Sequence, residues 1–470
     1  MRIRAMLCML FVLFSTALIT QAQSSPPVPS GKAGPGFLSK VTKVTGLSLV
    51  LPSATPPNYN DCLQNLGIPC YSPQQIRKAY RMNSLLEAGF NGTGQTIVII
   101  DSFGSPTIAD DLKHFDAAYG IPDPPSFRVL APLGTVPFDP TNLDQLGWAF
   151  EATLDVEWAH ATAPGASIVL LTSPVSETQG VQGMPEFLAL EKYALDHHLG
   201  NIISQSWSTT ENNLFTPEGQ QVFNDFQAFY ERAAREHVTV LAASGDFGST
   251  NPTLNPGEYF PFPTVVFPAS SPLVTAVGGT TLYVDATGSY QHETVWNNAG
   301  ITFYTGLLGN AVFGTASGGG VSQQFTEPEY QFRLSQSVQQ TLNNHRGIPD
   351  VAFNADMLTP TLFYAGFFPI PALNGYYTAS GTSVGTPQWA GIVAIANQFA
   401  GHPLGFLNPK LYSIAGRDDG AQSFRDITFG SNAFPFAGVA GYTAMRGWDL
   451  ATGWGTPKVD QLVQQLADQQ

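Results

Sequence analysis

Short apolar segments alternate with helical patterns along this chain of 470 residues, and this alternation most limits how the chain can fold. Strands that alternate with helices pack into a largely parallel sheet covered by helices. The sequence therefore predicts an α/β fold. The segments predicted to be strands are residues 96–100, 167–171, 201–204 and 238–242, and the helical stretches include residues 185–197 and 220–237.

A serine flanked by glycines precedes an apolar stretch in the last quarter of the chain. The segment is residues 380–387 (SGTSVGTP), and residues 387–399 after it are predicted to form a helix. A small turn at a helix start exposes a hydroxyl beside backbone N–H groups that can hold an anion. Subtilisin-type hydrolases present their nucleophile in such a setting. Because a serine hydroxyl is a weak nucleophile until a base takes its proton, the sequence must also supply a base.

The usual base, a histidine in a glycine-bracketed turn that leads into a helix, has no counterpart in this sequence. Each histidine lies in another context, and we interpret all of them as structural. They are His114, His160, His197, His198, His237, His292, His345 and His402.

Two carboxylates, Glu151 and Asp155, are the alternative base. They are four residues apart, which places both on one face of a helix about one turn from each other. Two acids on a buried face share a proton readily, because like charges held close together cannot both ionise cheaply. Without the serine motif, a solvated acidic face would be the better explanation of this pair, and we expect Glu157 and Asp144 to lie on such a face. The apolar neighbours that indicate a half-buried helix are Phe150, Leu154 and Trp158.

A third acid, Asp246, follows a segment that is typical of a buried parallel strand and lies in a glycine turn. Catalytic groups gather at the carboxyl ends of such strands. In a neutral serine peptidase this place would hold an amide donor for the oxyanion, and an aspartate can donate there only when it is protonated. The alternative is a turn aspartate that bonds to its own backbone.

The ordered series of these motifs resembles the sedolisin family, the serine-carboxyl peptidases. The resemblance extends over roughly residues 70 to 465 and implies a subtilisin-like three-layer sandwich with a mostly parallel central sheet. Besides the acidic pair and SGTSVGTP, the segments that carry it are residues 97–103 (IVIIDSF), 204–207 (SQSW), 243–246 (ASGD), 268–272 (PASSP), 277–280 (VGGT), 317–320 (SGGG) and 447–453 (GWDLATG).

The resemblance also implies a role for each catalytic candidate. Ser383 would be the nucleophile, and Glu151 the general base and later the general acid. Asp155 would orient Glu151 and share its proton, and Asp246 would stabilise the oxyanion together with the backbone N–H of Ser383. Asp101 matches the aspartate motif of subtilisins, but without a partner histidine we interpret it as structural. The residues expected to bind substrate are Ser204, Ser206, Ser317, Gly318 and Gly319.

One calcium ion is expected near the C-terminus, again from the resemblance. The carboxylates of Asp426 and Asp449 and the carbonyls of Ile427, Met445 and Gly447 match the ligands of the family's site. A set of oxygen ligands suits a hard cation such as calcium. The alternative for these glycine-rich turns is ordinary loop structure.

The N-terminus has the features of a secretory signal, with a charged start and an apolar core. We predict a signal peptide at residues 1–22, a linker or short propeptide remnant at 23–61, and the peptidase domain at 62–470. Cys8 would leave with the signal. In an exported protein the remaining pair, Cys62 and Cys70, suggests a disulfide, with a metal pair as the weaker alternative.

The formal net charge of −15, with only 12% charged residues, disfavours nucleic acid and anionic membranes as partners. We expect a secreted monomer that acts on proteins or peptides. Glu151 must be ionised and Asp246 neutral, and their ordinary pKa values near ~4.3 and ~3.9 predict a bell-shaped pH profile with its maximum at roughly pH 3 to 5.

The leading interpretation is thus an acid-active endopeptidase. A tripeptidyl aminopeptidase of the same family is an alternative, because a blocked cleft would release tripeptides. A neutral subtilisin-like peptidase would use Asp101 and one of the histidines. A binding protein on a decayed peptidase scaffold is the remaining alternative, which the presence of all four expected catalytic residues disfavours.

Overall fold

The computed structural model describes residues 48–49, 55–177, 179–304, 310–417 and 419–468. The predicted signal peptide and most of the predicted linker lie outside these residues. Within the linker, strand β1 (Ser48–Leu49) pairs with strand β17 (Gly375–Ala379), and helix α2 (Tyr59–Leu66) begins before residue 62. The domain boundaries stay a prediction.

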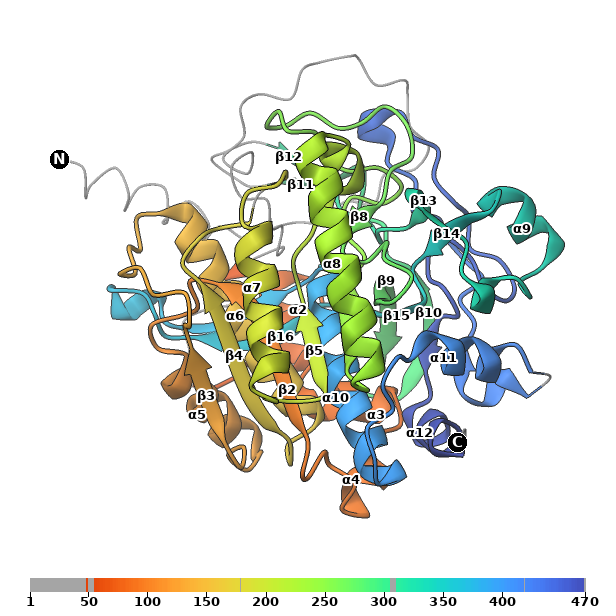
Figure 1. Ribbon diagram of the computed structural model, residues 1–470. Coiled ribbons are helices and arrows are strands. Elements are labelled where there is room, and N and C mark those ends of the chain that lie inside the picture. Colours follow the sequence, from red (N-terminus) through yellow and green to blue (C-terminus); the bar gives the residue numbers. More distant parts are fainter. Residues whose placement is uncertain (1–47, 50–54, 178, 305–309, 418, 469–470) are drawn as a thin grey trace.

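A mostly parallel sheet forms the centre of the described part of the chain (Figure 1). Seven of its eight strands follow the order β10-β9-β7-β5-β2-β4-β3, and β15 pairs with β9 as the eighth. Only the pairing of β10 with β9 is antiparallel. The strands are β2 (Thr96–Ser102), β3 (Phe127–Leu130), β4 (Ser167–Ser173), β5 (Ile202–Gln205), β7 (Thr239–Ala243), β9 (Thr275–Val284), β10 (Tyr290–Val295) and β15 (Val351–Asn354).

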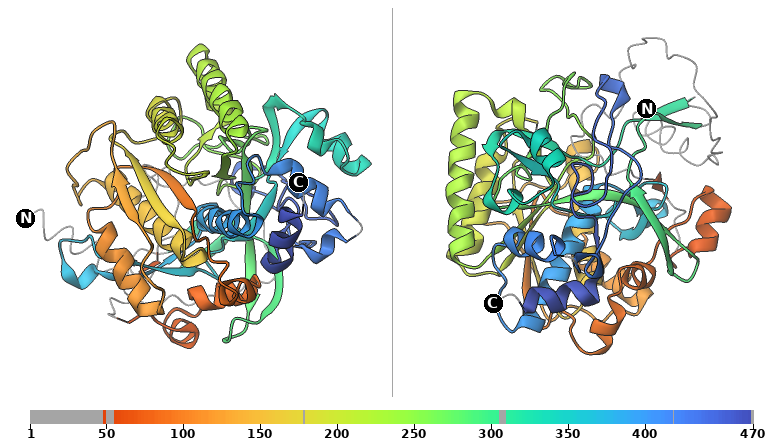
Figure 2. Two further views of the ribbon diagram at one scale, coloured as in Figure 1. Left: turned by 60° about the horizontal axis from the view of Figure 1, so that its bottom comes forward. Right: turned by 90° about the vertical axis from the view of Figure 1, so that its right-hand side faces the viewer.

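Both faces of this sheet are buried under helices (Figures 1 and 2). Successive side chains of a strand point to opposite faces, so Ile97 and Ile99 of β2 join one apolar cluster, and Val98 and Ile100 join the other. The first face carries α5 (Ile108–Tyr119), α6 (Leu143–Thr162) and α10 (Thr382–Ala400), and the second carries α7 (Met184–Asp196) and α8 (Pro217–Arg235). This arrangement confirms the predicted three-layer α/β fold.

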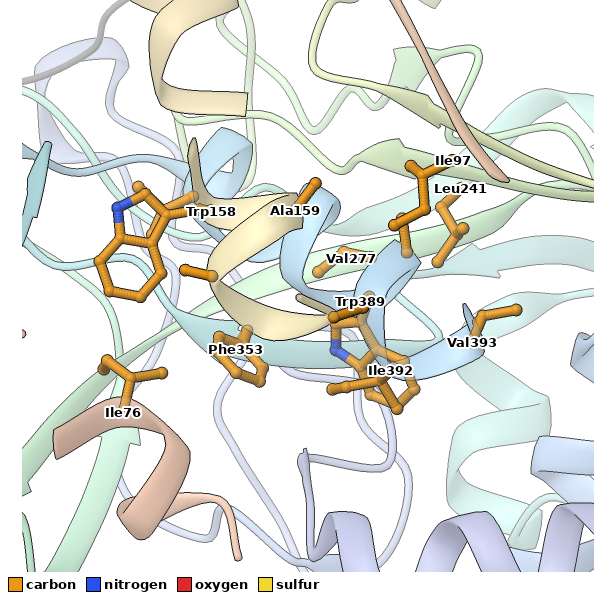
Figure 3. Close-up of a cluster of buried hydrophobic side chains, with 14 of the residues drawn as sticks. Ile76, Ile97, Trp158, Ala159, Leu241, Val277, Phe353, Trp389, Ile392 and Val393 are labelled. Carbon is orange, nitrogen blue, oxygen red and sulfur yellow. The ribbon is translucent and has the colours of Figure 1, made fainter. Parts of the chain in front are cut away.

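Helices α6 and α10 pack directly against each other within the first layer. A Cβ atom at Gly391 of α10 would lie 2.6 Å from the Cβ of Thr162 of α6, so glycine permits this close approach. Every residue of α6 from Trp148 to Thr162 is buried. Figure 3 shows the apolar cluster in which the two helices meet the sheet, and its labelled residues include Trp158, Ala159, Val277, Phe353, Trp389 and Ile392.

The start of α10 differs from the prediction. The helix was expected at residues 387–399, but it begins at Thr382, so Pro387 lies inside it. The N-cap residue Gly381 has a φ of 116°, a conformation that favours glycine and that changes the direction of the chain in front of the helix. Pro387 has no N–H to give the carbonyl of Ser383, four residues earlier. The helix tolerates this loss in its second turn, and Ser383 therefore belongs to its first turn.

The other predicted elements agree with the observed ones to within three residues at either end. Cys62 and Cys70, 5.8 Å apart at Cα, form a disulfide. None of the described helices combines the length and the apolar character needed to cross a bilayer. The remaining helices are α3 (Pro73–Ala79), α4 (Asn83–Glu87), α9 (Gln336–Leu342), α11 (Asn408–Ala415) and α12 (Val459–Ala467).

Small sheets surround the central one, and each of their pairings is antiparallel. The sheet of β1 and β17 also contains β16, which lies over α6. The strands of these sheets not yet given are β6 (Thr209–Thr210), β8 (Val266–Phe267), β11 (Ile301–Tyr304), β12 (Asn310–Phe313), β13 (Gly320–Thr326), β14 (His345–Ile348), β16 (Thr361–Ala365), β18 (Phe424–Arg425) and β19 (Thr456–Pro457).

Candidate active site

Ser383 lies in the first turn of α10, where the backbone N–H groups have no partners within the helix. Its side chain is nearly buried, at 8% exposure. Its Oγ is 3.5 Å from the carbonyl oxygen of Ser206, which follows the end of β5. This long contact leaves the hydroxyl free to turn toward a stronger acceptor, and the positive end of the helix dipole favours negative charge at this place.

Glu151 and Asp155 lie on α6, one helical turn apart, and both are completely buried. Glu151 lines the same pocket as Ser383, whereas Asp155 is not among the residues that line it. The helix therefore presents one carboxyl group to the pocket and holds the second behind it. This is the arrangement that a base and its supporting acid require.

Asp246 follows the carboxyl end of β7 and faces the start of α10. Its Oδ1 accepts hydrogen bonds from the backbone N–H of Thr382, at 2.8 Å, and from the Thr382 hydroxyl, at 2.9 Å. Burial raises the pKa of Asp246 from its ordinary value to about 7, the bonds from Thr382 oppose this rise, and the charge of Glu151 adds to it. The carboxyl group is thus neutral in acid.

The second oxygen of Asp246, Oδ2, is the one that can carry the proton, because Oδ1 is occupied by two donors. A Cβ atom at Gly381 would lie only 2.7 Å from Oδ2. The glycine in front of α10 therefore does more than turn the chain. It leaves room for a protonated carboxyl group beside the nucleophile.

One pocket joins these groups, and Ser383, Glu151, Asp246, Ser206 and Trp207 are among its lining residues. No histidine lines it within the described part of the chain. His160, for example, binds the carbonyl oxygen of Pro122 instead. The pocket thus combines a hydroxyl with carboxyl groups and offers no imidazole base, which removes the support for a subtilisin-like triad.

The structure places the five residues expected to bind substrate in different surroundings. Ser206 lines the pocket, whereas Ser204 is buried in β5 and is not among the lining residues. The hydroxyl of Ser317 donates to the carbonyl of Ala451 and accepts from the N–H of Gly279. Gly318 and Gly319 are also buried, and a Cβ atom on either one would lie 2.1 Å from a backbone oxygen. These glycines are therefore needed where backbones pack closely beside the site.

Known proteins are similar to this chain in sequence and in fold. No protein-family model matches the chain. Kumamolisin from Bacillus sp. (strain MN-32) is 35% identical over 86% of the chain, and tripeptidyl-peptidase 1 from Rattus norvegicus is 30% identical over 67%. The solved structure of Pseudomonas sedolisin, a serine-carboxyl proteinase complexed with two molecules of pseudo-iodotyrostatin, superposes with a TM-score of 0.69 and 25% identity, covering 86% of this chain and 99% of that one. The chain belongs to the sedolisin family.

This sedolisin-family chain spans only part of its curated relatives. It covers 65% of the length of kumamolisin and 51% of that of the rat tripeptidyl-peptidase. The match to the solved sedolisin structure is nearly complete by contrast. The shared region is therefore the three-layer domain that carries the pocket.

Sequence reasoning missed two residues of the site, Thr382 and Asn251. Thr382 holds Asp246, and its place directly before Ser383 in SGTSVGTP could have indicated this role. Asn251 lines the pocket from a loop of the chain after β7. No motif or spacing connects Asn251 with the catalytic segments, so only the fold reveals it.

The prediction that Glu157 lies on a solvated face of α6 was wrong. Glu157 is completely buried and accepts the backbone N–H of Tyr364 at 2.9 Å. The opposite face of α6 is covered by β16 and α5, so this helix has no solvated face beyond its first turns. Asp144 lies in that first turn and is partly exposed, as expected.

The two segments that carry the expected calcium ligands, residues 426–427 and 445–449, lie next to each other. The backbone N–H of Gly447 donates to Asp426 at 2.9 Å, and that of Met445 donates to Asp449 at 3.0 Å. The side chain of Met445 is 42% exposed, and a thioether does not suit a hard cation, so only its carbonyl could contribute. In the described part of the chain, no three or more His, Cys, Asp or Glu side chains are placed to hold a metal ion, so a cation here would need backbone carbonyls. That donor set fits calcium.

Proposed function

We propose that this chain is a serine-carboxyl peptidase that cleaves peptide bonds through an acyl-enzyme at Ser383. The observation that carries the proposal is the single pocket lined by Ser383, Glu151 and Asp246. A hydroxyl, a buried carboxyl group able to act as base, and a second carboxyl group that is neutral in acid supply the three functions that acyl transfer needs.

In the first step, Ser383 Oγ attacks the substrate carbonyl carbon while the Glu151 carboxylate takes the hydroxyl proton. Asp155 shares the proton that Glu151 gains, since two buried acids one turn apart cannot both stay charged at low cost. The oxyanion forms beside the N–H of Ser383 and the protonated oxygen of Asp246. Both donors are held in place before the reaction, so they stabilise the charge without reorganisation.

In the second step, Glu151 returns its proton to the leaving amine and the peptide C–N bond breaks, which leaves the acyl group on Ser383. A water molecule then loses a proton to Glu151 and attacks the ester. Collapse of this second oxyanion frees Ser383, which regains its proton from Glu151. The same carboxyl group thus acts first as base and then as acid in both halves of the reaction.

An acid-active enzyme is the consequence of these protonation states. Glu151 must be ionised in the free enzyme, and Asp246 must be neutral, which its pKa of about 7 allows throughout the acid range. We therefore expect maximal activity in acid and a fall in activity as pH rises through about 7.

Digestion of casein between pH 3 and 8 tests this function. Wild type should digest casein best in acid, and Ser383→Ala should lose activity by about 10³-fold or more. A neutral optimum would contradict the role of Asp246. An inactive wild type that still binds peptide would favour a binding protein on a peptidase scaffold.

We further propose an endopeptidase that acts outside the cell, with tripeptide release as the alternative within the family. The alternative is supported by relatives that are named tripeptidyl-peptidase. A peptide with an acetylated N-terminus separates the two modes. An endopeptidase cleaves it internally, whereas an enzyme that needs a free N-terminus leaves it intact and releases tripeptides from the uncapped form.

A calcium ion bound by Asp426, Asp449 and the carbonyls of Ile427, Met445 and Gly447 is also part of the proposal. The ion would hold the 445–449 turn against β18 and would take no part in the chemistry. A ligand that binds only the folded state raises its stability by about 4 kcal/mol at a thousandfold excess over Kd. Removal of calcium should therefore lower Tm, and Asp449→Asn should abolish the response of Tm to added calcium. An equal response in wild type and variant would reject the site.

A further inference from the structure

The pocket next to Ser383 has both apolar and polar walls beyond its catalytic groups. Trp207, Phe247, Pro252 and Val266 are among the residues that line it. Among the residues that the structure describes, no lysine or arginine lines it, and only Glu151 and Asp246 contribute carboxyl groups. A substrate side chain with an apolar stem would fit these walls, and a charged end would find no dedicated countercharge.

Asn251 adds a polar side chain to these walls, and Gln179 and Ser208 also line them. Its side chain is only 1% exposed, and its Nδ2 donates to the carbonyl oxygen of Thr264, at 3.0 Å, and to the Thr264 hydroxyl, at 3.2 Å. These bonds fix the orientation of the amide, because a flipped amide would place Oδ1 against the carbonyl oxygen. Among the described residues, none donates a hydrogen bond to Oδ1.

The neighbourhood of Gly245 indicates where this unpartnered oxygen points. Gly245 lines the same pocket, and its φ is 103°. A Cβ atom on Gly245 would lie 3.3 Å from the side chain of Val266 and 3.5 Å from Asn251 Oδ1. Because residue 245 has no side chain, no Cβ atom is packed against Oδ1 and Val266 at this wall of the pocket.

Ser206 provides a second uncommitted polar atom. Its carbonyl accepts from Ser383 Oγ, but its own hydroxyl is buried and has no hydrogen-bond partner among the described residues. A buried polar atom without a partner is costly and points to a ligand or water that satisfies it. The pocket therefore offers a fixed acceptor at Asn251 and a hydroxyl at Ser206 that can donate.

We propose that this pocket receives an uncharged amide side chain, that of glutamine or asparagine, from the residue whose carbonyl Ser383 attacks. The amide NH₂ donates to Asn251 Oδ1, its oxygen accepts from the Ser206 hydroxyl, and its methylene stem packs on the apolar walls. A carboxylate of the same shape is disfavoured by Glu151 and cannot donate to Asn251. This inference depends on the proposed peptidase function and names its substrate preference.

Matched peptides test the inference through kcat/KM. Two pairs differ only at the residue before the cleaved bond: glutamine against methionine, and asparagine against leucine. Wild type should prefer the amide of each pair by about tenfold or more, since a site built to bind a polar group rejects an analogue that leaves it unpaired. Asn251→Leu should bring both ratios close to one, and Ser206→Ala should lower them partly.

Controls keep the result interpretable. Ser249→Ala removes another buried hydroxyl of the same loop, one that does not line the pocket, and should keep the wild-type ratios. If Asn251→Leu fails to fold, which its Tm reveals, Ser206→Ala carries the test. Equal cleavage of both peptides of each pair by wild type, or wild-type ratios in both pocket variants, would overturn the inference. Failure to cleave any peptide would instead reject the peptidase function itself.

Discussion

Two glutamates of α6 are equally buried but lie in different surroundings. Glu151 and Glu157 are six residues apart, and both have 0% exposure. Glu151 lines a pocket together with a hydroxyl at a helix start. Glu157 is closed off by β16, whose Tyr364 gives it a backbone hydrogen bond.

The surroundings of Glu157 contain further acids. Burial raises its pKa well above the ordinary value, the bond from Tyr364 opposes this rise, and the charges of Asp111 and Asp116 add to it. Burial also raises the pKa of Asp111 to about 6, although the Thr107 hydroxyl donates to it at 2.7 Å. The other titratable groups of this region include Arg77, His114, Tyr119, His160, Tyr364 and Tyr376.

The comparison teaches that burial and a raised pKa do not identify a catalytic acid. Both glutamate regions contain several acids in a low-dielectric interior, where the charged form is disfavoured. Only the region of Glu151 combines these acids with a nucleophile and a space that a substrate can enter. For the region of Glu157, the raised pKa values predict instead that the stability of the α5–α6 packing depends on pH.

The largest expected effect is a loss of activity in the region of Glu151, because Glu151 and not Glu157 is expected to act on Ser383. Ser383→Ala and Glu151→Gln should each lower kcat by about 10³-fold or more, and the double variant should be hardly worse than either, because the two groups act as one unit. The measurement is kcat for a fluorogenic peptide at pH 4. Losses that multiply in the double variant would show that the two groups act independently.

A smaller effect is expected at Asp246. An amide at this position can donate to the oxyanion at every pH, so Asp246→Asn should lose the fall in kcat/KM that wild type shows as pH rises through about 7. We expect an activity at pH 4 within about tenfold of wild type, close to the cost of weakening one hydrogen bond. The exposed Asp468→Asn is the control. An unchanged alkaline limb in Asp246→Asn would contradict the assignment.

The smallest effect is expected on stability, at Glu157. Its folded-state pKa is raised, so the folded chain binds more protons than the unfolded chain above pH ~4.5, and stability falls as pH rises from there toward the folded-state pKa. Glu157→Gln keeps the acceptor for Tyr364 and should raise Tm at pH 7, by roughly 2–4 °C per kcal/mol gained. At pH 3.5 the variant and wild type should melt alike. The exposed Glu231→Gln should change neither value, and a lower Tm for Glu157→Gln at pH 7 would refute the account.

The sequence predicted the central strands and the catalytic candidates because each lies in a local pattern. Ser383 and Asp246 stand in glycine turns after or before apolar segments, and Glu151 is linked to Asp155 by helical spacing. These signals depend only on a few neighbouring residues. The three-layer fold then follows from the order of strands and helices.

Other features could not be predicted, for physical reasons. α6 is buried on all sides from Trp148 onward, so its pattern shows no polar face from which the burial of Glu157 could be inferred. A proline before an apolar stretch is typical of a helix start, so the sequence places the start at Pro387. Only the backbone conformation of Gly381 shows that the helix begins earlier. Asn251 reaches the pocket through a loop whose course depends on distant contacts with Thr264.

The most direct test compares the two glutamates in acid. We would measure kcat/KM of Glu151→Gln and Glu157→Gln from pH 3 to 6 on one peptide, with the folded fraction of each variant determined at every pH. If a carboxylate activates Ser383, Glu151→Gln loses about 10³-fold or more at every pH and Glu157→Gln stays within about threefold of wild type. Substantial proteolysis by folded Glu151→Gln in acid would contradict the account.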